Sequence, residues 1–427
     1  MSLTQGLVRL IRAKAVTQDD LDAAALFTLD AVASAIGGRS TGPGQKLLAW
    51  GQGHSGDAGR RALLMGGLTH ILEIDDLHRA SVVHPGCVVV PAAYVLAQQK
   101  GATGRDLLTA VLHGFEATCR IGMAVGREHY KIWHSTATCG PFGSAMAGAE
   151  LLGLNDDEAV DALGNAGTQS AGLWQFLATG AMSKHLHAGR GAEAGVVAAE
   201  LAKLGFSGPS QILEGPQGLF AGACPDADAE AVLRDPDHRW QVHETSIKPW
   251  PSCRHTHPAI DAALELSHQI PEPSRIAAVD LKTYAVAVDV CDRAHPDSVY
   301  EAKFSLHHCI AAALVDGRVD FASFEADARA RLADVRAQIM PQVTERYTSA
   351  YPYDWGSALA VTLDDGTRLQ AERSHCKGDP EAPLSKAEMK AKAHMLMELG
   401  GCSDSARLID AILSMAYDGP VPDPNLL

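Results

Sequence analysis

The chain has 427 residues, of which 46% are hydrophobic and 20% charged, and its formal net charge is −15. Because single hydrophobic cores stop growing near about 250–300 residues, this length predicts two domains. The acidity disfavours nucleic acid as a partner, since phosphate binding needs a basic face. No stretch reaches the roughly 18 uninterrupted apolar residues of a membrane span, and the N-terminus lacks a secretory pattern, so we expect a cytoplasmic protein without membrane contact.

The cysteine and histidine spacings do not suggest a metal centre. The nine cysteines are scattered singly and form no Cys-x-x-Cys pair, which disfavours a zinc knuckle, a thioredoxin motif, a disulfide framework and an iron–sulfur cluster. His185 and His187 lie two residues apart, as do His255 and His257, without the i, i+4 spacing of a zinc protease. We therefore expect no metal and no cofactor.

The first half reads almost wholly as helix. Thr17 to Asp20 resembles a capped start of an Ala/Leu run that ends at Gly37-Gly38, and Thr103 to Asp106 opens a second run to about Val125. Asn155 to Glu158 caps a third helix. Segments rich in Ala and Gly, at 143–154 and 188–204, are typical of core helices that approach one another closely.

The pattern changes after residue 248. An alternating run over 276–290 and a paired run over 358–372, joined across 364–367, predict strands. Helical segments are predicted near 257–268, 300–315 and 321–340. After Pro380 the chain returns to helix with a capping box at Ser385, and these last helices are expected to pack back on the N-terminal domain. We predict a mainly α fold, with an all-helical domain of residues 1–247 plus 380–427 and a smaller α+β domain of residues 248–379.

One candidate cluster combines acids with an imidazole. Glu73, Asp75 and Asp76 precede the extended stretch that contains His84. A carboxylate can orient an imidazole and raise its basicity, which prepares a general base. Taken alone, an acidic helix end with solvated charges is the simpler interpretation.

Two further segments place polar groups ahead of core helices. His134 is followed by small hydroxyl residues, which suit a carboxylate at a helix N-terminus but also suit ordinary capping. Lys184, His187 and Arg190 would project from one side of a helix. A cationic stripe on a buried helix needs an anionic partner, either Asp/Glu or a ligand, whereas on an exposed helix it needs none.

The densest reversal of charge lies at residues 248–257. Lys248, Arg254, His255 and His257 surround Pro249 and Pro251 in this acidic chain. Cationic side chains of this kind can hold a small carboxylate, and the prolines favour an extended segment. A solvated loop is the competing interpretation.

Taken in order, these motifs resemble the MmgE/PrpD family, which includes 2-methylcitrate dehydratase, cis-aconitate decarboxylase and iminodisuccinate epimerase. The resemblance rests on Glu73-Ile74-Asp75-Asp76, His84-Pro85-Gly86, His134 with its Ser/Thr tail, Lys184-x-x-His187-x-Gly189-Arg190, Lys248-x-x-Pro251-x-Cys253-x-x-x-His257 and Glu301-Ala302-Lys303-Phe304-Ser305. It implies a large helical domain, a smaller α+β lid inserted before the final helices, a homodimer, and a metal-independent site between the domains.

The resemblance also implies roles for single residues. His84 and His134 would be the base and the acid in either order, with Lys184 and Lys248 as catalytic charge stabilisers. The predicted substrate-binding residues are Glu73, Asp75, Asp76, Arg190, Cys253, Arg254 and His257. Glu73 replaces the usual aspartate, and Leu77 and Cys253 stand where the decarboxylases have a threonine and a histidine.

From this resemblance we predict that the protein is a hydro-lyase. It would act on a hydroxylated di- or tricarboxylate of the 2-methylcitrate type, by proton abstraction next to a carboxylate. An epimerase or isomerase of a substituted succinate is the alternative within enzymes. A non-catalytic binder of anionic metabolites is the third hypothesis.

Overall fold

The computed structural model describes residues 1–53 and 56–423. About 60% of the chain is helical and 8% is strand, which confirms the mainly α prediction. The chain divides into two compact units, which we call the helical unit (Met1–Ile247 with Ser385–Leu427) and the mixed unit (Lys248–Leu384).

The helical unit is built from helices and one two-stranded ladder, in which β1 pairs antiparallel with β2. Its elements are α1 (Leu3–Ala13), α2 (Gln18–Gly38), α3 (Gly42–Gly51), α4 (Ala58–His70), β1 (Leu77–His78), α5 (Gly86–Lys100), α6 (Gly104–Ala124), α7 (Arg127–Ile132), α8 (Ser135–Leu152), α9 (Asp156–Gly167), α10 (Ser183–Lys203), α11 (Leu219–Ala223), β2 (Thr245–Ser246), α19 (Lys386–Leu399) and α20 (Ser405–Ser414).

The predicted caps start helices in the structure. Thr17, Thr103, Asn155 and Ser385 each accept a hydrogen bond from the third residue of the helix that follows and complete a capping box. These reciprocal bonds satisfy amide groups that a helix start would otherwise leave without partners. Local sequence therefore defines the starts of α2, α6, α9 and α19.

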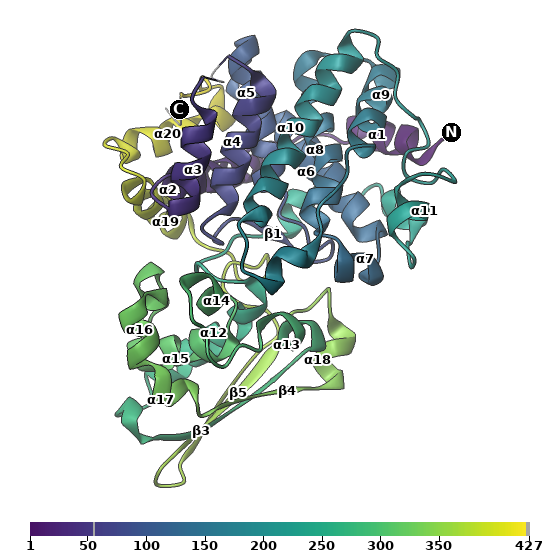
Figure 1. The fold of residues 1–427 in the computed structure, drawn as a ribbon. Coiled ribbons are helices and arrows are strands. Elements are labelled where there is room, and N and C mark those ends of the chain that lie inside the picture. Colours follow the sequence, from purple (N-terminus) through teal and green to yellow (C-terminus); the bar gives the residue numbers. More distant parts are fainter. Residues whose placement is uncertain (54–55, 424–427) are drawn as a thin grey trace. The chain divides into compact units, whose positions relative to one another are not determined.

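Small residues bring the helices around α10 close together. This helix packs against α4, α5, α8 and α9 (Figure 1). A Cβ atom on Gly189 would lie 2.4 Å from the carbonyl oxygen of Leu63, and one on Gly195 would lie 2.2 Å from the Cβ atom of Ser144. Side chains at these two positions would push α10 away from α4 and α8, so the Gly/Ala-rich segments are core helices, as predicted.

The C-terminal helices pack on α2, also as predicted. Lys392 of α19 donates to the carbonyl oxygen of Ile74 at 2.7 Å and pairs with Asp30 of α2 at 2.5 Å. Among the described residues, α2 is the one helix whose length and composition would allow it to cross a membrane. Of its apolar 18-residue segment, 83% is buried in the fold. That burial is typical of a core helix.

The mixed unit contains a four-stranded sheet in the order β4-β3-β5-β6. Strand β3 is parallel to β4 and antiparallel to β5, and β5 and β6 form the predicted hairpin. Its elements are α12 (His257–Ser267), β3 (Ile276–Thr283), α13 (Ala285–Cys291), α14 (Val299–Lys303), α15 (Leu306–Asp316), α16 (Ala326–Arg331), α17 (Ala333–Arg336), β4 (Ile339–Val343), α18 (Glu345–Ala350), β5 (Ser357–Leu363) and β6 (Arg368–Arg373).

Three element predictions in this unit were wrong in part. The strand predicted over 276–290 ends at Thr283, and α13 follows with Ala287 and Cys291 buried at helical spacing. The helix predicted over 321–340 is divided, and its last two residues begin β4 because Ile339 pairs with Val279. The helix predicted over 300–315 is interrupted where the Ser305 side chain caps α15.

Candidate functional site

Three predicted site residues stand at the N-terminal ends of three packed helices in the helical unit. His84 lies two residues before α5, His134 is the N-cap residue of α8, and Lys184 is the second residue of α10. The backbone N–H of His84 donates to Thr136 Oγ1 of α8 at 3.0 Å. Helix N-termini carry unsatisfied N–H groups and partial positive charge, so this meeting point favours an anion.

The acidic loop between α4 and β1 supplies three carboxylates to the same place. Glu73, Asp75 and Asp76 are each at most 2% exposed, so the interpretation as solvated charges was wrong. Glu73 adopts φ of +60°, a left-handed conformation that non-glycine residues rarely take. Each carboxylate has a different partner.

Glu73 pairs with Lys184. The Lys184 Nζ atom lies 2.6 and 2.7 Å from the two carboxylate oxygens, and both side chains are buried. A buried ammonium needs such a partner, because its charge loses the stabilisation that water provides. The structure therefore supplies the anionic partner that the cationic stripe on α10 requires.

Asp75 lies against two imidazoles. Its Oδ2 atom is 2.6 Å from His70 Nδ1 and 3.8 Å from His84 Nδ1. His84 Nδ1 also lies 2.5 Å from the carbonyl oxygen of Asp76, so a proton on Nδ1 is held there and Nε2 is the basic nitrogen of the neutral ring. This arrangement orients His84 as the prediction of a general base requires.

His70 is a cluster residue that the sequence analysis missed. Its ring lies 4.8 Å from that of His84 and 5.7 Å from that of His134, between centroids. It is the last residue of α4 and is fully buried. The available signal was a histidine at the end of an apolar helix, five residues before Asp75, but nothing local distinguishes it from a core histidine.

Asp76 caps α5 instead of pairing with a cation in the cluster. Its two oxygens accept from the backbone N–H of Gly86, both at 3.0 Å. Burial raises the pKa of Asp76 well above its usual value, and the nearby carboxylates of Asp75 and Asp30 act in the same direction. Protonation of this carboxyl therefore relieves charge repulsion in the loop.

His134 lies between other imidazoles and aromatic rings. Burial lowers the pKa of His134 well below its usual value, and repulsion from His70 and Lys184 adds to the effect. Its Nδ1 atom lies 3.4 Å from Nδ1 of His187, and burial similarly lowers the pKa of His187 to about 4. Both rings are therefore neutral at pH 7, so each has one nitrogen that can accept a proton.

Among the described residues, two groups of side chains could offer ligands to a metal ion: His70, Asp75 and His84 in this site, and His375, Asp379 and Glu381 in the mixed unit. Nitrogen and oxygen atoms of His70, Asp75 and His84 lie within 4.8 Å of one another. Two ligands of a tetrahedral zinc ion, at 2.0–2.1 Å from the metal, are about 3.3 Å apart. The 2.6 Å contact between His70 and Asp75 is shorter than that and has the length of a charge-assisted hydrogen bond.

Arg190 has its partner outside the group of residues described above. It is exposed and pairs with Glu193 on the next turn of α10. Its assignment to substrate remains a prediction.

The residues that the structure brings together form a cluster, which we call the imidazole–carboxylate cluster. It consists of His70, Glu73, Asp75, Asp76, His84, His134, Lys184 and His187. It unites most of the predicted residues of the helical unit.

The other predicted residues belong to the mixed unit. Lys248 is its first residue and is buried, and the backbone N–H of Cys253 donates to the carbonyl oxygen of Lys303 at 2.8 Å. The guanidinium of Arg254 pairs with Asp379, and although burial opposes the charge, Asp379 raises the pKa of Arg254. His257 begins α12, and its Nε2 donates to the carbonyl oxygen of Ser252 at 3.3 Å.

The prediction of an extended segment over 248–257 was wrong at the end of that segment. Residues 254–256 form a short 3₁₀ turn directly before α12. Arg254 and His257 are held by partners within the mixed unit, and their assignment to substrate remains a prediction.

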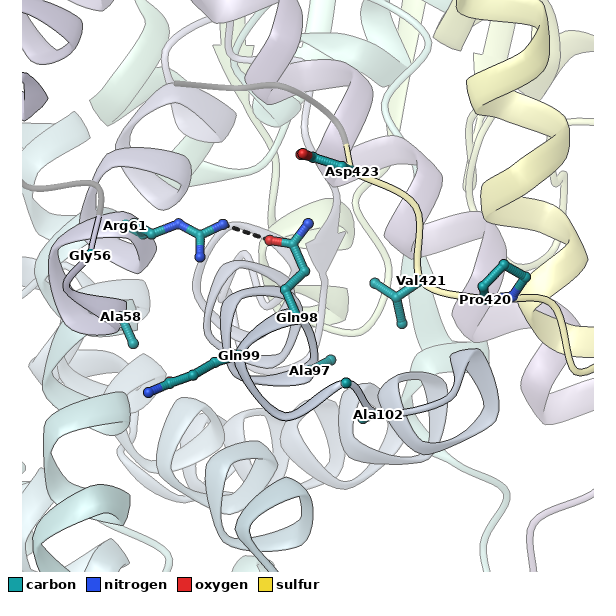
Figure 2. Close-up of a pocket in the computed structure, with 11 residues that line it drawn as sticks. Gly56, Ala58, Arg61, Ala97, Gln98, Gln99, Ala102, Pro420, Val421 and Asp423 are labelled. Carbon is teal, nitrogen blue, oxygen red and sulfur yellow. Dashed lines mark hydrogen bonds between the residues drawn. The ribbon is translucent and has the colours of Figure 1, made fainter.

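A groove of about 650 Å³ lies elsewhere on the helical unit, where the end of α5 meets residues 420–423 (Figure 2). Figure 2 shows the guanidinium of Arg61 bonded to the Gln98 side chain, at 2.6 Å. Its lining consists of Gly56, Ala58, Arg61, Ala97, Gln98, Gln99, Gly101, Ala102, Pro420, Val421 and Asp423. These residues are distinct from the cluster, so the groove is a separate feature.

Comparison with known proteins relates the chain to cis-aconitate decarboxylases. It is 27% identical over 373 residues to a cis-aconitate decarboxylase of Aspergillus terreus, covering 80% of this chain and 75% of the relative. It is 26% identical over 377 residues to the Mus musculus cis-aconitate decarboxylase, covering 84% and 75%. The Homo sapiens enzyme of that name is 26% identical over 349 residues, covering 78% and 71%.

Both halves of the chain match one family. Residues 6–231 match the MmgE/PrpD N-terminal domain, and residues 250–416 match the MmgE/PrpD C-terminal domain. Together these matches cover most of the sequence. The first contains the imidazole–carboxylate cluster, and the second contains residues 250–257. The chain therefore belongs to the MmgE/PrpD family.

Proposed function

We propose that this chain is a lyase that acts on a di- or tricarboxylate by proton transfer at a carbon next to a carboxylate. The observation that carries the proposal is the meeting of His84, His134 and Lys184 at three helix N-termini. Positive helix ends and the Lys184 ammonium would stabilise a carboxylate and the enolate-like charge that forms when its neighbouring carbon loses a proton. The neutral imidazoles can accept and return that proton.

In its finer form, the proposal is a metal-independent hydro-lyase for a hydroxylated acid of the 2-methylcitrate type. The base takes the proton from carbon, the C–O bond to the neighbouring hydroxyl breaks, and the acid protonates the leaving oxygen. The products are an alkene and water. Lys248 of the mixed unit belongs to the same proposal as a second charge stabiliser, in a small-molecule enzyme that acts as a homodimer.

Decarboxylation is the second candidate, because the relatives named above are cis-aconitate decarboxylases. In that reaction the C–C bond to one carboxylate breaks, carbon dioxide leaves, and an imidazolium returns a proton to carbon. Two departures from the decarboxylase pattern that the resemblance implies weigh against it: Leu77, buried in β1, offers no hydroxyl, and Cys253 offers no imidazole.

The test uses the purified chain with citrate, 2-methylcitrate, cis-aconitate and substituted succinates in deuterated water, followed by proton NMR. A new alkene from a hydroxy acid supports the hydro-lyase, and loss of carbon dioxide from cis-aconitate supports the decarboxylase. Deuterium uptake at carbon without an alkene indicates an epimerase. Binding without any exchange at carbon would contradict the enzyme proposal and indicate a carboxylate binder.

Two controls sharpen the experiment. Lys131→Ala removes an exposed lysine that pairs with Glu128 outside the cluster, so turnover is expected to persist. Dialysis against EDTA is expected to leave turnover unchanged, and a loss restored by a divalent cation would contradict metal independence.

A further inference from the structure

Trp174 begins a short 3₁₀ turn, Trp174–Ala178. The residues just before this turn are hydrogen-bonded to the imidazole–carboxylate cluster. The backbone N–H of His134 donates to the carbonyl oxygen of Gly172 at 2.9 Å. Gly172 has φ of +136°, and a Cβ atom there would lie 2.5 Å from Ala137 Cβ and 3.2 Å from His187 Nδ1. Only glycine fits so close to these residues, so the path of this segment fixes Trp174 next to the cluster.

Aromatic rings of this segment cover the two neutral imidazoles. The Trp174 ring lies 4.8 Å from that of His134, between centroids. The Phe176 ring lies 5.5 Å from that of His187 and 5.4 Å from that of Trp174. The Trp174 ring also lies 5.2 Å from that of Tyr130, between centroids, in an edge-to-face arrangement. These contacts fix the plane of the indole, and therefore the direction of its N–H group.

The indole N–H is buried, and no described residue supplies it with an acceptor. Indole nitrogen can only donate, so a neighbouring donor cannot satisfy it. Leaving such a group without a partner costs about 1–3 kcal/mol. Within the described part of the chain, the Nε2 atoms of His134 and His70 are likewise buried without a hydrogen-bond partner. Three unused polar atoms around one cluster indicate that a polar ligand completes it.

The surroundings favour an acceptor that carries negative charge. Trp174 packs against His134, which precedes the positive N-terminal end of α8, and the backbone N–H groups of a helix start favour an anion. Lys184 is the second residue of α10, and its ammonium, which pairs with Glu73, also interacts electrostatically with His134. A carboxylate oxygen is the acceptor that fits both the donor and the charge.

We propose that Trp174 is a substrate-binding residue whose indole N–H donates a hydrogen bond to a carboxylate oxygen of the ligand. This inference rests on the proposed function, because it places the ligand of that function at the same cluster. The Trp174 and Phe176 rings form one wall of the ligand site, so the part of the ligand that touches this wall is a carboxylate flanked by an apolar surface.

The experiment replaces Trp174 by phenylalanine, which keeps an aromatic ring and removes the N–H group. Citrate and succinate are the probes, and titration calorimetry measures their dissociation constants. Trp174→Phe is expected to weaken the binding of at least one probe by about 10–100-fold, the effect of losing a hydrogen bond to a charged group. The matched control, Trp50→Phe on α3, removes a half-exposed indole and is expected to leave binding unchanged.

A second measurement does not depend on a variant's folding. In the wild-type chain labelled with nitrogen-15, six indole N–H signals are expected from the six tryptophans. Addition of citrate is expected to move one of them downfield, and this signal is the one absent from Trp174→Phe. Absence of any indole shift would overturn the inference.

The inference and the proposed function can fail separately. If the wild-type chain converts a carboxylate and Trp174→Phe has unchanged KM and kcat, the inference is wrong and the function stands. If no acid is converted but Trp174→Phe weakens citrate binding, the inference stands and the enzyme proposal falls. If the wild-type chain binds neither probe, the inference is overturned.

Discussion

The Lys184 ammonium and the Glu73 carboxylate form a buried ion pair with both carboxylate oxygens within 2.7 Å of Nζ. Replacing Lys184 by methionine would leave a buried carboxylate without this cation. We expect Lys184→Met to abolish turnover and to lower the free energy of unfolding by about 3–5 kcal/mol, measured by urea denaturation.

The double variant separates the two effects. Lys184→Met combined with Glu73→Gln removes both charges, so it is expected to recover part of the lost stability without recovering turnover. Lys131→Met, which removes the exposed pair with Glu128, is expected to cost about 0–1 kcal/mol. Equal destabilisation by the two lysine variants would show that burial of the first pair has no energetic consequence.

Asp75 holds His70 by a 2.6 Å contact and places its charge 3.8 Å from His84 Nδ1. Asp75→Asn keeps the shape of the side chain and removes the charge that favours the correct ring tautomers. We expect kcat to fall by about 10–100-fold, the range typical of residues that position a reacting group, with a smaller change in KM.

The helical unit supplies a matched control for this variant. Asp20 contacts His243 Nε2 at 2.8 Å in a second carboxylate–imidazole pair, formed by residues outside the cluster. Asp20→Asn is expected to keep wild-type kcat. A similar loss of kcat in both variants would mean that Asp75 acts through general stability and has no positioning role.

The sequence predicted the parts of the fold that short-range rules determine. Thr17, Thr103, Asn155 and Ser385 define helix starts because a cap and its partner lie three residues apart. Strand β4 could not be predicted in this way. Its residues lie at the end of a helical pattern, and pairing with β3, some 60 residues earlier, determines their conformation.

The same distinction applies to the site. His84, His134 and Lys184 were singled out by their local motifs, and the family resemblance implied their roles. His70 and Trp174 were not, since their significance arises from contacts with His84 and His134 that exist only in the folded chain. The environment of the acidic loop could not be predicted for a related reason. A sequence does not show whether its carboxylates are buried or which partners they have, so solvated side chains are the default expectation.

We expect the folded protein to lose stability at acidic pH because His78 is buried in its neutral form. Burial lowers the pKa of His78 to about 4, against about 6.5 in an unfolded chain. Its Nδ1 atom accepts from the backbone N–H of Ser81 at 3.3 Å, which requires the neutral ring. Below pH 6.5 the unfolded chain binds a proton that the folded chain excludes, so stability is complete above that pH and falls as the pH approaches 4.

A shift of this size corresponds to about 3 kcal/mol for a buried group. His78→Asn places an oxygen where Nδ1 accepts and cannot be protonated in this range. We expect its Tm to fall less steeply than that of the wild type between pH 6.5 and 4, measured by circular dichroism. His268→Asn, at an exposed position, is expected to retain the wild-type slope. Parallel slopes in all three proteins would contradict the assignment.

Arg254 and Asp379 form the corresponding buried pair of the mixed unit. Asp379→Asn leaves a buried guanidinium without its anionic partner, and we expect it to lower the free energy of unfolding by about 3–5 kcal/mol. Asp316→Asn disrupts the pair with the half-exposed Arg331 at 2.7 Å and is expected to cost about 0–1 kcal/mol.

Kinetics then decide whether Arg254 also contacts substrate. A structural role predicts that Arg254→Met lowers stability while KM and kcat of the remaining folded enzyme stay near wild type. A substrate contact predicts a rise in KM of about 10-fold or more, from loss of a hydrogen bond between charged groups. Asp379 binds the guanidinium at Nη2, whereas Nη1 is buried and has no hydrogen-bond partner among the described residues, so we expect the second result. Lowered stability with KM and kcat near wild type would overturn the assignment of Arg254 to substrate.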